Sequence, residues 1–278
     1  MILLLSLACA PRPPEAPPGM VAIPAGTSTV GSPRVGDQPP PGGGPVVRSR
    51  REVALSAYAI DRYEVTRADY AAFLAATGYR LPSVGEDWAE DGGYGWSALE
   101  DGARLADHPV VLISWYDAAE YCLWRGARLP TEAEWEVAAL GGDGRAWPWG
   151  DTFDPAACNH GKASDPFFDS SDGWEKTSPV GRYPAGPRGL YDAYGNAWEW
   201  VADAWGGGWA DVRSGGGPGP MKDPRADEPA LYRGARGGSY YFAFELNPDG
   251  ERNGFLAELR RKTTGVRCAV SLPTGQER

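Results

Sequence analysis

The chain has 278 residues and a formal net charge of -10, with 42% apolar and 23% charged residues. These values are typical of a globular protein, and the length allows one large domain or two small ones. The negative charge argues against nucleic acid as a partner, because a protein that neutralises phosphates needs a basic surface. Since 38 glycines, 26 prolines and 12 tryptophans are present, we expect much irregular backbone around large aromatic side chains.

Residues 1–19 predict an export leader followed by a proline-rich linker. The apolar run MILLLSLAC ends in small residues and Cys9, and SLAC is similar to the processing box of bacterial lipoproteins, in which the cysteine is lipidated. Ser6 stands where that box prefers Leu, and no Lys or Arg precedes the run. We expect an exported bacterial protein, periplasmic or at the cell surface, attached to the membrane only through Cys9. The alternative is an apolar N-terminus without a sorting role.

Strands are predicted within residues 19–32 and 51–65, on either side of a surface loop at 31–45. Three short amphipathic helices follow, each begun by a Ser or Thr cap with an acid three residues later: Thr66 with Asp69, Ser114 with Asp117, and Thr131 with Glu134. The third helix ends at the glycine pair 141–142. After it we expect loops and short strands, because turn-forming clusters alternate with short aromatic runs. No internal repeat and no linker after residue 45 is found, so we predict one domain over 20–272 and a tail at 273–278.

Common catalytic signatures are missing from the sequence. It has no phosphate-binding loop, no dinucleotide-binding glycine pattern, no HExxH and no GxSxG. Its two histidines, His108 and His160, nearly exclude a site that needs several imidazoles. A Ser-His-Asp triad is formally open, but His108 precedes a proline and no nucleophile is marked out.

Five segments occur in an order that carries a family resemblance. They are HPVVLISWYDAAEYCLWRGARLPTEAEWEVAALGG, WPWGD, SPVGRYPAGPRGLYDAYGNAWEWVADAW, RGGSYYF and TGVRCAV. From about Met20 to Val270 the chain resembles the formylglycine-generating enzyme family, also called the sulfatase-modifying-factor domain. The resemblance implies an α+β fold that is a variant of the C-type lectin-like fold, with three short helices, short strands and a high loop content. It also implies bound calcium and a substrate groove.

The resemblance implies two structural calcium ions held by loops. The first would be bound by Asn159, the His160 carbonyl, Asp172 and the Trp174 carbonyl. The second would be bound by Asp192, the carbonyls of Gly195 and Ala197, and Glu199. Calcium takes six to eight oxygen ligands, which loops can supply. The alternative is that Asp172 and Asp192 only cap turns.

The resemblance also pairs Cys122 with Cys268 in a disulfide, which would close a loop of about 145 residues and stabilise by roughly 4 to 5 kcal/mol. The alternative is two buried thiols. Cys158 is left over, beside Asn159 and near His160. It could be a reactive thiol or part of a soft-metal site, but a buried unreactive cysteine is the commoner case.

Copper is not expected. Oxidase members of the family bind copper(I) through two cysteines that lie three and eight positions after the serine of the GGS motif. Counted from Ser239, these positions are Phe242 and Asn247. Copper(I) needs soft thiolate ligands, which neither residue offers. Ser239 matches the active-site serine of the family, but a hydroxyl without a base or a metal is no catalyst.

Three functions are therefore open. The first is a binding or scaffold protein whose groove takes a peptide, protein or glycan, with aromatics that could instead be core: Tyr240, Tyr241, Phe242 and Phe244. The second is a periplasmic oxidoreductase that uses another metal or none, similar to members that mature siderophores, with acids such as Glu245 or Glu251. The third, formylglycine generation, requires a different register in which Cys268 or Cys158 replaces a lost ligand.

Overall fold

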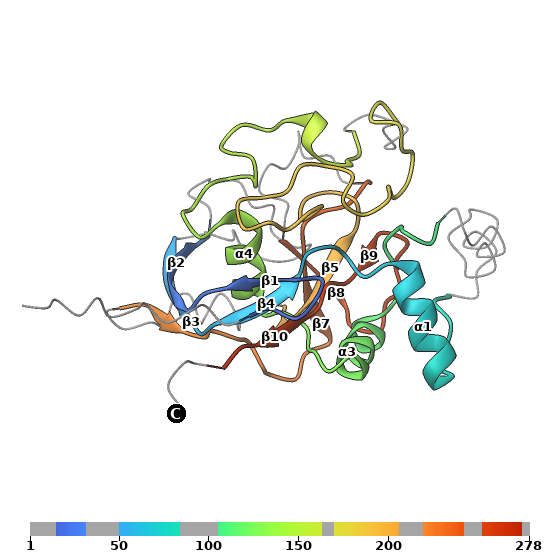
Figure 1. The fold of residues 1–278 in the computed structure, drawn as a ribbon, viewed down its shortest axis with the longest axis horizontal. Helices are drawn as coiled ribbons and strands as arrows, with labels where there is room; N and C mark the ends of the chain where they lie inside the picture. The colour runs from blue at the N-terminus through green and yellow to red at the C-terminus, as the bar shows by residue number, and fades with distance from the viewer. Residues whose placement is uncertain are drawn as a thin grey trace, which may run out of the picture.

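Strands from both ends of the chain meet in the computed structural model, which describes residues 15–31, 50–83, 105–162, 170–205, 219–241 and 252–273. In one three-stranded sheet, β4 (Tyr58–Asp61) lies between β1 (Met20–Ile23) and β10 (Ala269–Ser271), and both pairings are antiparallel. The register places Ile60 opposite Val21 and Ala269. All four residues of β4 are buried, so this strand joins the two ends of the chain inside the fold (Figure 1).

A second sheet is built around β3 (Arg51–Leu55), which pairs with β2 (Gly26–Val30) antiparallel and with β6 (Met221–Lys222) parallel. The strands predicted within 19–32 and 51–65 are therefore confirmed as β1 to β4. Each of those segments contains two strands separated by a break of two residues.

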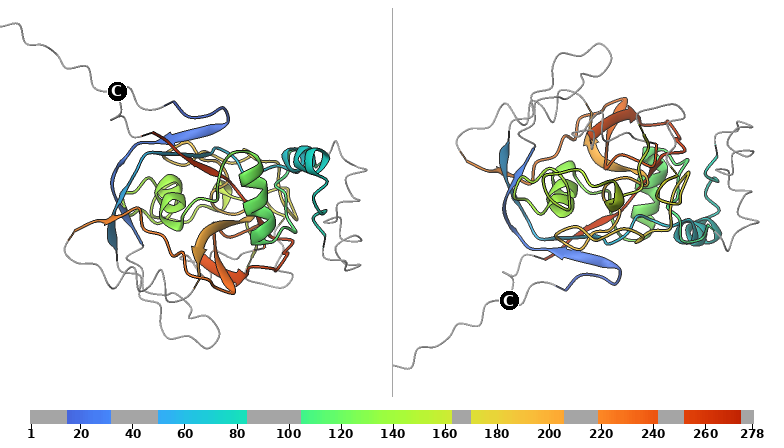
Figure 2. Two further views of the ribbon diagram at one scale, coloured as in Figure 1. Left: turned by 90° about the horizontal axis from the view of Figure 1, so that it is seen from below. Right: turned by 90° about the horizontal axis from the view of Figure 1, so that it is seen from above.

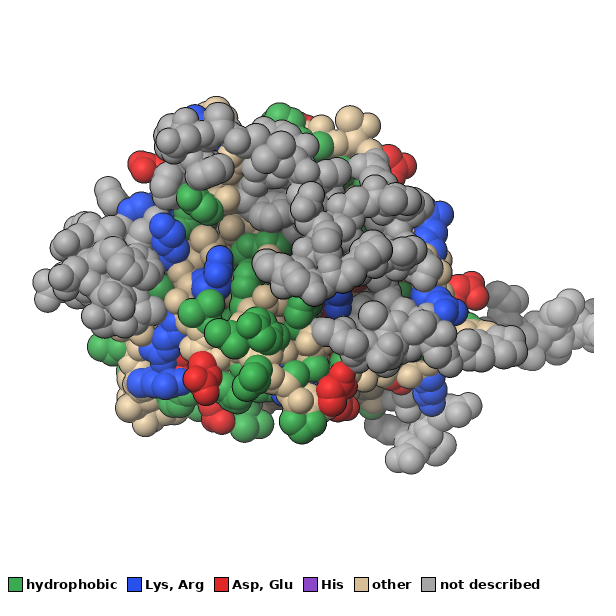
Figure 3. All heavy atoms as spheres, turned by 180° about the vertical axis from the view of Figure 1, so that it is seen from behind, with side chains coloured by type: hydrophobic (Ala, Val, Ile, Leu, Met, Phe, Trp, Pro, Cys, Tyr) green, Lys and Arg blue, Asp and Glu red, His purple; other side chains and the backbone are tan. Residues whose placement is uncertain are grey.

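The third sheet has the order β8-β7-β5-β9, from β8 (Arg252–Leu256), β7 (Tyr232–Arg236), β5 (Trp198–Ala204) and β9 (Thr264–Gly265). All seven residues of β5 are buried. The sheet lies on the side turned away from the viewer of Figure 1, as both views of Figure 2 show. On that side hydrophobic side chains are exposed among basic and acidic ones (Figure 3). The opposed pair Tyr232 and Leu256, 46% and 43% exposed, is part of this sheet.

The three predicted helices are confirmed as α1 (Arg67–Thr77), α3 (Trp115–Trp124) and α4 (Glu132–Leu140). Each has a complete capping box, in which the cap side chain accepts from the amide of the acid and the acid accepts from the cap amide. Gly78 and Gly141 end α1 and α4 in the left-handed conformation. A short 3-10 helix at Pro155–Ala157 follows.

Helix α4 differs from its prediction as an amphipathic helix. All nine residues are buried, and the helix packs against β2, β5 and β7, inside the ring of strands seen in Figure 2. Burial is possible because its acids have basic partners. The guanidinium of Arg128 donates to both carboxylate oxygens of Glu134, at 2.7 and 2.6 Å, and the Arg236 guanidinium lies 2.7 Å from Glu136.

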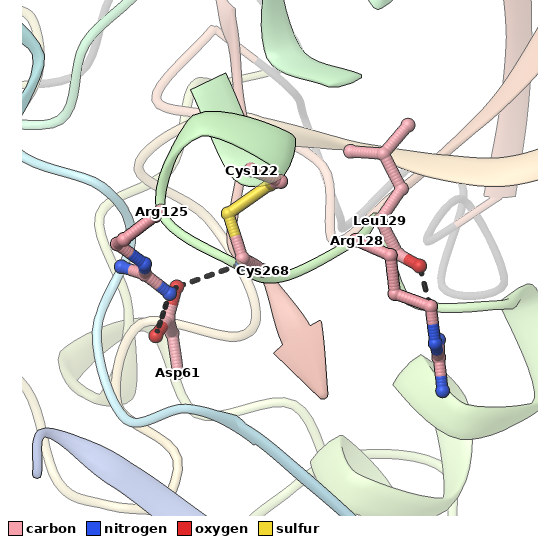
Figure 4. The surroundings of a disulfide bond; sticks show 6 residues. All are labelled: Asp61, Cys122, Arg125, Arg128, Leu129 and Cys268. Atoms are coloured by element: carbon pink, nitrogen blue, oxygen red, sulfur yellow. Dashed lines mark hydrogen bonds and ion pairs between the residues drawn. A yellow bond between two sulfur atoms is a disulfide. The ribbon is translucent and has the colours of Figure 1, made fainter. Parts of the chain in front are cut away.

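The disulfide between Cys122 and Cys268 is confirmed. It links α3 to the residue before β10, and Figure 4 shows Asp61 and Arg125 beside it. Asp61 accepts a hydrogen bond of 2.7 Å from the Cys268 amide, and its two carboxylate oxygens lie 2.5 and 2.7 Å from the Arg125 guanidinium. The disulfide and the hydrogen bond to Asp61 therefore both fix the start of β10, and Arg125 neutralises the charge of Asp61.

Candidate functional site

Residues 237–241, which follow β7, lie against the loop that precedes β5. Gly237 has a φ of +96°, and a Cβ there would lie 2.7 Å from the carbonyl oxygen of Ala193. The amide of Gly195 donates to the Gly237 carbonyl at 2.8 Å. Glycine at 237 therefore allows both the left-handed backbone and the close approach of the two loops.

Ser239 is buried at the base of this loop, with 1% of its surface exposed. Its hydroxyl accepts a hydrogen bond of 3.3 Å from the amide of Tyr241. The next residue, Tyr240, is also buried; its amide donates to the Asn196 carbonyl at 3.0 Å and its hydroxyl to the Lys262 carbonyl at 3.3 Å. Ser239 and Tyr240 thus fix the loop, whereas Tyr241 is 38% exposed. Of the aromatics considered for a groove, Tyr240 is core and Tyr241 is accessible.

A pocket of about 330 Å³ opens beside Tyr241. Its walls come from one end of the loop and from the segment that leads into β9: Tyr241, Leu259, Arg260, Arg261, Lys262 and Thr263. Sequence reasoning did not identify this pocket. The basic run 260–262 in an acidic chain was the available signal, but only the fold shows that Tyr241 stands across from it.

The residues of the first predicted calcium set lie in two neighbouring loops. Asn159 is fully buried, and its amide nitrogen donates to the carbonyl of Lys176 at 2.8 Å. Its Oδ1 atom is buried without a hydrogen-bond partner among the described residues. Asp172 accepts from the amide of Trp174 at 2.9 Å and from the hydroxyl of Tyr183 at 2.5 Å. The first of these bonds is the turn contact that the alternative interpretation of Asp172 expects.

The second predicted set is buried around the loop that precedes β5. Asp192 has a φ of +52° and accepts from the amide of Gly181, while its Oδ1 atom has no hydrogen-bond partner in the described part of the chain. Burial raises the pKa of Asp192 to about 6. Glu199 accepts from the Trp135 indole at 2.5 Å and from the guanidinium of Arg267 at 2.5 and 2.6 Å.

Glu64 is a further buried acid of this region, which the sequence analysis missed. Its carboxylate accepts from the Asn196 side chain at 2.6 Å and from the Ala197 amide at 3.0 Å. Burial, and then repulsion from Asp192 and Glu199, raises the pKa of Glu64 well above its ordinary value. No motif marks it, because it lies 132 residues before its partner Asn196.

These observations fit a hard cation in the loop region. Among the described residues, the Oδ1 atoms of Asn159 and Asp192 are buried without a hydrogen-bond partner. The carboxylates of Glu64, Asp192 and Glu199 interact electrostatically with the Arg267 guanidinium, and calcium prefers oxygen ligands of this kind. The loops also touch: a Cβ at Gly195 would lie 2.2 Å from the carbonyl oxygen of Asn159. Within the described ranges no three His, Cys, Asp or Glu side chains are grouped as a metal site. Both sets therefore depend on their backbone carbonyls.

A second buried charge network joins α4 to the third sheet. The Arg252 side chain contacts Glu132, and the Arg236 guanidinium lies 3.6 Å from the same carboxylate. Asp203, on β5, accepts from the amides of Glu132 at 2.7 Å and Ala226 at 2.8 Å. Burial, and then the charge of Glu132, raises the pKa of Asp203 to about 7.

Asp203 should make the protein less stable as the pH rises. Its folded pKa of about 7 lies above the unfolded value of about 4, so the folded chain binds this proton more tightly and the free energy of unfolding falls between about pH 4 and pH 7. Urea unfolding at pH 5 and pH 7.5 measures the fall, and an Asp203→Asn variant should show a smaller one. Equal pH slopes in both proteins would contradict this assignment.

Cys158 is the one free cysteine in the described residues, and it is buried. Burial, and then the charge of Asp172, raises the pKa of its thiol above the ordinary value. A protonated, buried thiol is a poor nucleophile and metal ligand. This favours a core role over a reactive one.

Some predicted positions lie outside the described residues: Cys9, Phe242, Phe244, Glu245, Asn247 and Glu251. Expectations about them rest on the sequence. The described helices include none that is long and apolar enough to cross a bilayer.

Comparison with known proteins agrees with this architecture. The model of the sulfatase-modifying factor enzyme 1-like domain matches residues 7–272. The chain is 38% identical to the formylglycine-generating enzyme of Thermomonospora curvata, over 82% of this chain and 84% of that protein. It is 34% identical to the inactive C-alpha-formylglycine-generating enzyme 2 of Bos taurus, over 70% and 73%.

Among solved structures, PvdO from Pseudomonas aeruginosa superposes with a TM-score of 0.66 and 27% identity, covering 91% of this chain and 94% of that one. This similarity, together with the three helices and the short strands, confirms the expected α+β, C-type lectin-like fold. With its family model matched over nearly the whole length, the chain belongs to the sulfatase-modifying factor family, also known as the formylglycine-generating enzyme family.

Proposed function

We propose that the chain is an exported binding module of this family, stabilised by calcium and without copper-dependent oxidase activity. One observation carries the proposal: a pocket lies beside the Ser239 loop, while the positions that bear copper ligands in oxidase relatives are Phe242 and Asn247. An aromatic ring and a neutral amide do not replace thiolates on copper(I).

The remaining cysteines support the proposal. Cys122 and Cys268 are bonded to each other, and Cys158 is buried with a raised thiol pKa. In the third candidate function, Cys268 or Cys158 would have to serve as a metal ligand, and neither is available as a thiolate. Relatives named as active and as inactive are both similar to this chain, so similarity alone does not assign the oxidase reaction.

The ligand in this proposal is a peptide, protein or glycan rather than nucleic acid. Export would follow from the leader, with a lipid on Cys9 as the membrane attachment. A lectin-like scaffold suits such a role, because loops on a rigid framework commonly form recognition surfaces.

Copper loading and peptide oxidation test the proposal together. Purified protein is incubated with copper(I) and oxygen and assayed on a cysteine-containing sulfatase peptide, with the Thermomonospora curvata enzyme as the positive control. We expect no bound copper and no aldehyde product. Binding of one equivalent of copper together with oxidation of the peptide would overturn the proposal. Oxidation of the peptide with another metal would favour the alternative oxidoreductase.

Calcium removal should lower the thermal stability. A ligand present at 100 times its dissociation constant stabilises the folded state by about 2.7 kcal/mol, so a chelator should reduce the melting temperature by several degrees and calcium should restore it. Asp192→Asn should lose the part of this response that comes from the second predicted set, because it replaces a carboxylate whose Oδ1 atom is buried without a partner in the described chain.

The matched control is Glu258→Gln, which removes one charge from an exposed position and should keep the full calcium response. Magnesium should not substitute, since it requires shorter bonds and a stricter geometry. A chelator-insensitive wild type would contradict the calcium part of the proposal and leave the copper test unaffected.

A further inference from the structure

The pocket beside Tyr241 has a charge opposite to that of the whole chain. The net charge of the protein is -10, yet the described residues that line the pocket include three consecutive cations and no acid: Tyr241, Leu259, Arg260, Arg261, Lys262 and Thr263. A concave site lined by one sign of charge concentrates ligands of the opposite sign. The charge of the pocket therefore favours an anionic ligand.

Arg260 already forms an ion pair and two hydrogen bonds within the protein. Its guanidinium lies 2.9 Å from the carboxylate of Asp117 and donates to the carbonyls of Leu81 and Ser83, both at 2.8 Å. These contacts neutralise its charge and anchor the segment to α3. Arg261 and Lys262 add two further positive charges to the wall of the pocket.

Arg261 differs from Arg260, since no carboxylate contacts its guanidinium in the part of the chain that the structure describes. Its Nε atom is buried without a hydrogen bond to the described residues, and its guanidinium lies 4.3 Å from the ring centroid of Phe255. Arg236, Arg252 and Arg267, in contrast, each contact a carboxylate. A buried donor that lacks an acceptor destabilises the free protein, and a bound oxyanion would supply that acceptor.

Lys262 adds a second charge beside an aromatic wall. Its ammonium lies 5.4 Å from the ring centroid of Tyr241. Burial, and then repulsion from Lys176, lowers the pKa of Lys262, and burial lowers that of Arg261. An anion in the pocket would reverse both effects, because it stabilises the charged forms of these side chains.

We propose that this pocket binds a small organic oxyanion, a carboxylate or a phosphate or sulfate ester on an apolar body, through Arg261 and Lys262. The Arg261 fork would bind the oxyanion, and Tyr241 and Leu259 would contact the apolar body. A volume of about 330 Å³ is at the small end of ligand sites. The inference rests on the proposed function, since it assigns ligand chemistry to the same pocket.

Calorimetric titration with four probes tests it: benzoate, phenyl phosphate, neutral benzamide and inorganic phosphate. Benzoate and phenyl phosphate should bind; benzamide, which has the shape without the charge, and inorganic phosphate, which has the charge without the ring, should bind at least tenfold more weakly. Arg261→Gln should weaken benzoate and phenyl phosphate about tenfold or more, the loss typical of one charge-assisted hydrogen bond. Lys262→Gln should act in the same direction.

Lys222→Gln is the matched control, because Lys222 is exposed on β6 and the substitution removes the same charge. It should bind like the wild type. Unchanged melting temperatures would show that the Arg261 and Lys262 variants are folded; if Arg261→Gln unfolds, Arg261→Lys is used, which keeps the charge and loses the fork.

Binding of benzamide as tight as that of benzoate, or equal affinities for wild type and a folded Arg261 variant, would overturn the inference. So would a folded wild type that binds none of the anions. These outcomes are separate from the copper assay: anion binding together with copper-dependent turnover would overturn the proposed function and keep the anion site.

Discussion

Replacing Arg267 by Met should destabilise the fold by about 3 to 5 kcal/mol, the usual cost of leaving buried charges without their partner. Arg267 is fully buried and its guanidinium forms a two-pronged contact with Glu199, at 2.5 and 2.6 Å. The same group donates to the carbonyls of Asp61, Arg62 and Tyr191, at 3.1, 3.2 and 2.9 Å. It therefore joins the end of β4, the loop before β5 and β5 itself.

The loss is large because Arg267 faces an excess of negative charge. Its removal would leave Glu64, Asp192 and Glu199 without the cation that partly offsets the rise that burial causes in the pKa of the first two. Urea unfolding at pH 7 gives the free energy. Arg128→Met is the control, since the Arg128 side chain is 34% exposed in its pair with Glu134; its loss should cost less than that of Arg267, because water screens the partly exposed pair.

The calcium response provides a second test of the Arg267→Met variant. If the cation binds beside Asp192 and Glu199, it partly replaces the missing guanidinium charge, and Arg267→Met should gain more stability from calcium than the wild type does. Equal losses of unfolding free energy in Arg267→Met and Arg128→Met would show that the buried pair contributes no more than the partly exposed pair. An equal calcium response in wild type and Arg267→Met would place the ion away from these carboxylates.

The sequence predicted best what local chemistry decides. The three helix starts were correct because a cap and its acid are three residues apart and bond within one turn. The burial of α4 was missed because Glu136 is paired by Arg236, 100 residues away. No periodicity within a nine-residue helix reports such a partner.

The candidate site also has parts that the sequence predicted and parts that it did not. Motif resemblance predicted the disulfide, which is confirmed, and it drew attention to the Ser239 loop, since its motifs are continuous segments of sequence. The two calcium sets stay predictions. Glu64 and the wall at residues 260–262 belong to no motif, and they reach the site only through β4 and through the turn before β9. The sequence identified residue types, but it did not show which distant segments lie together in the fold.

Removing the Cys122–Cys268 disulfide should cost about 4 to 5 kcal/mol. The bond spans 146 residues, and the chain-entropy model gives a cost of this size for so long a loop. A Cys122→Ala, Cys268→Ala double variant should unfold at a much lower urea concentration than the wild type, because the loss is comparable to the whole stability of a weak domain. Reduction with dithiothreitol should lower the wild type toward the variant.

Two controls separate the crosslink from simple loss of side-chain volume. Cys158→Ala removes a sulfur atom from a buried, unbonded position, so its cost, about 1 kcal/mol, estimates the packing contribution of each cysteine. Dithiothreitol should not shift the double variant. The Asp61 contact with the Cys268 amide, at 2.7 Å, still holds the strand after the bond is cut, so β10 should stay paired with β4 at low urea. A double variant no less stable than Cys158→Ala would mean that this hydrogen bond, and not the disulfide, holds β10 against β4.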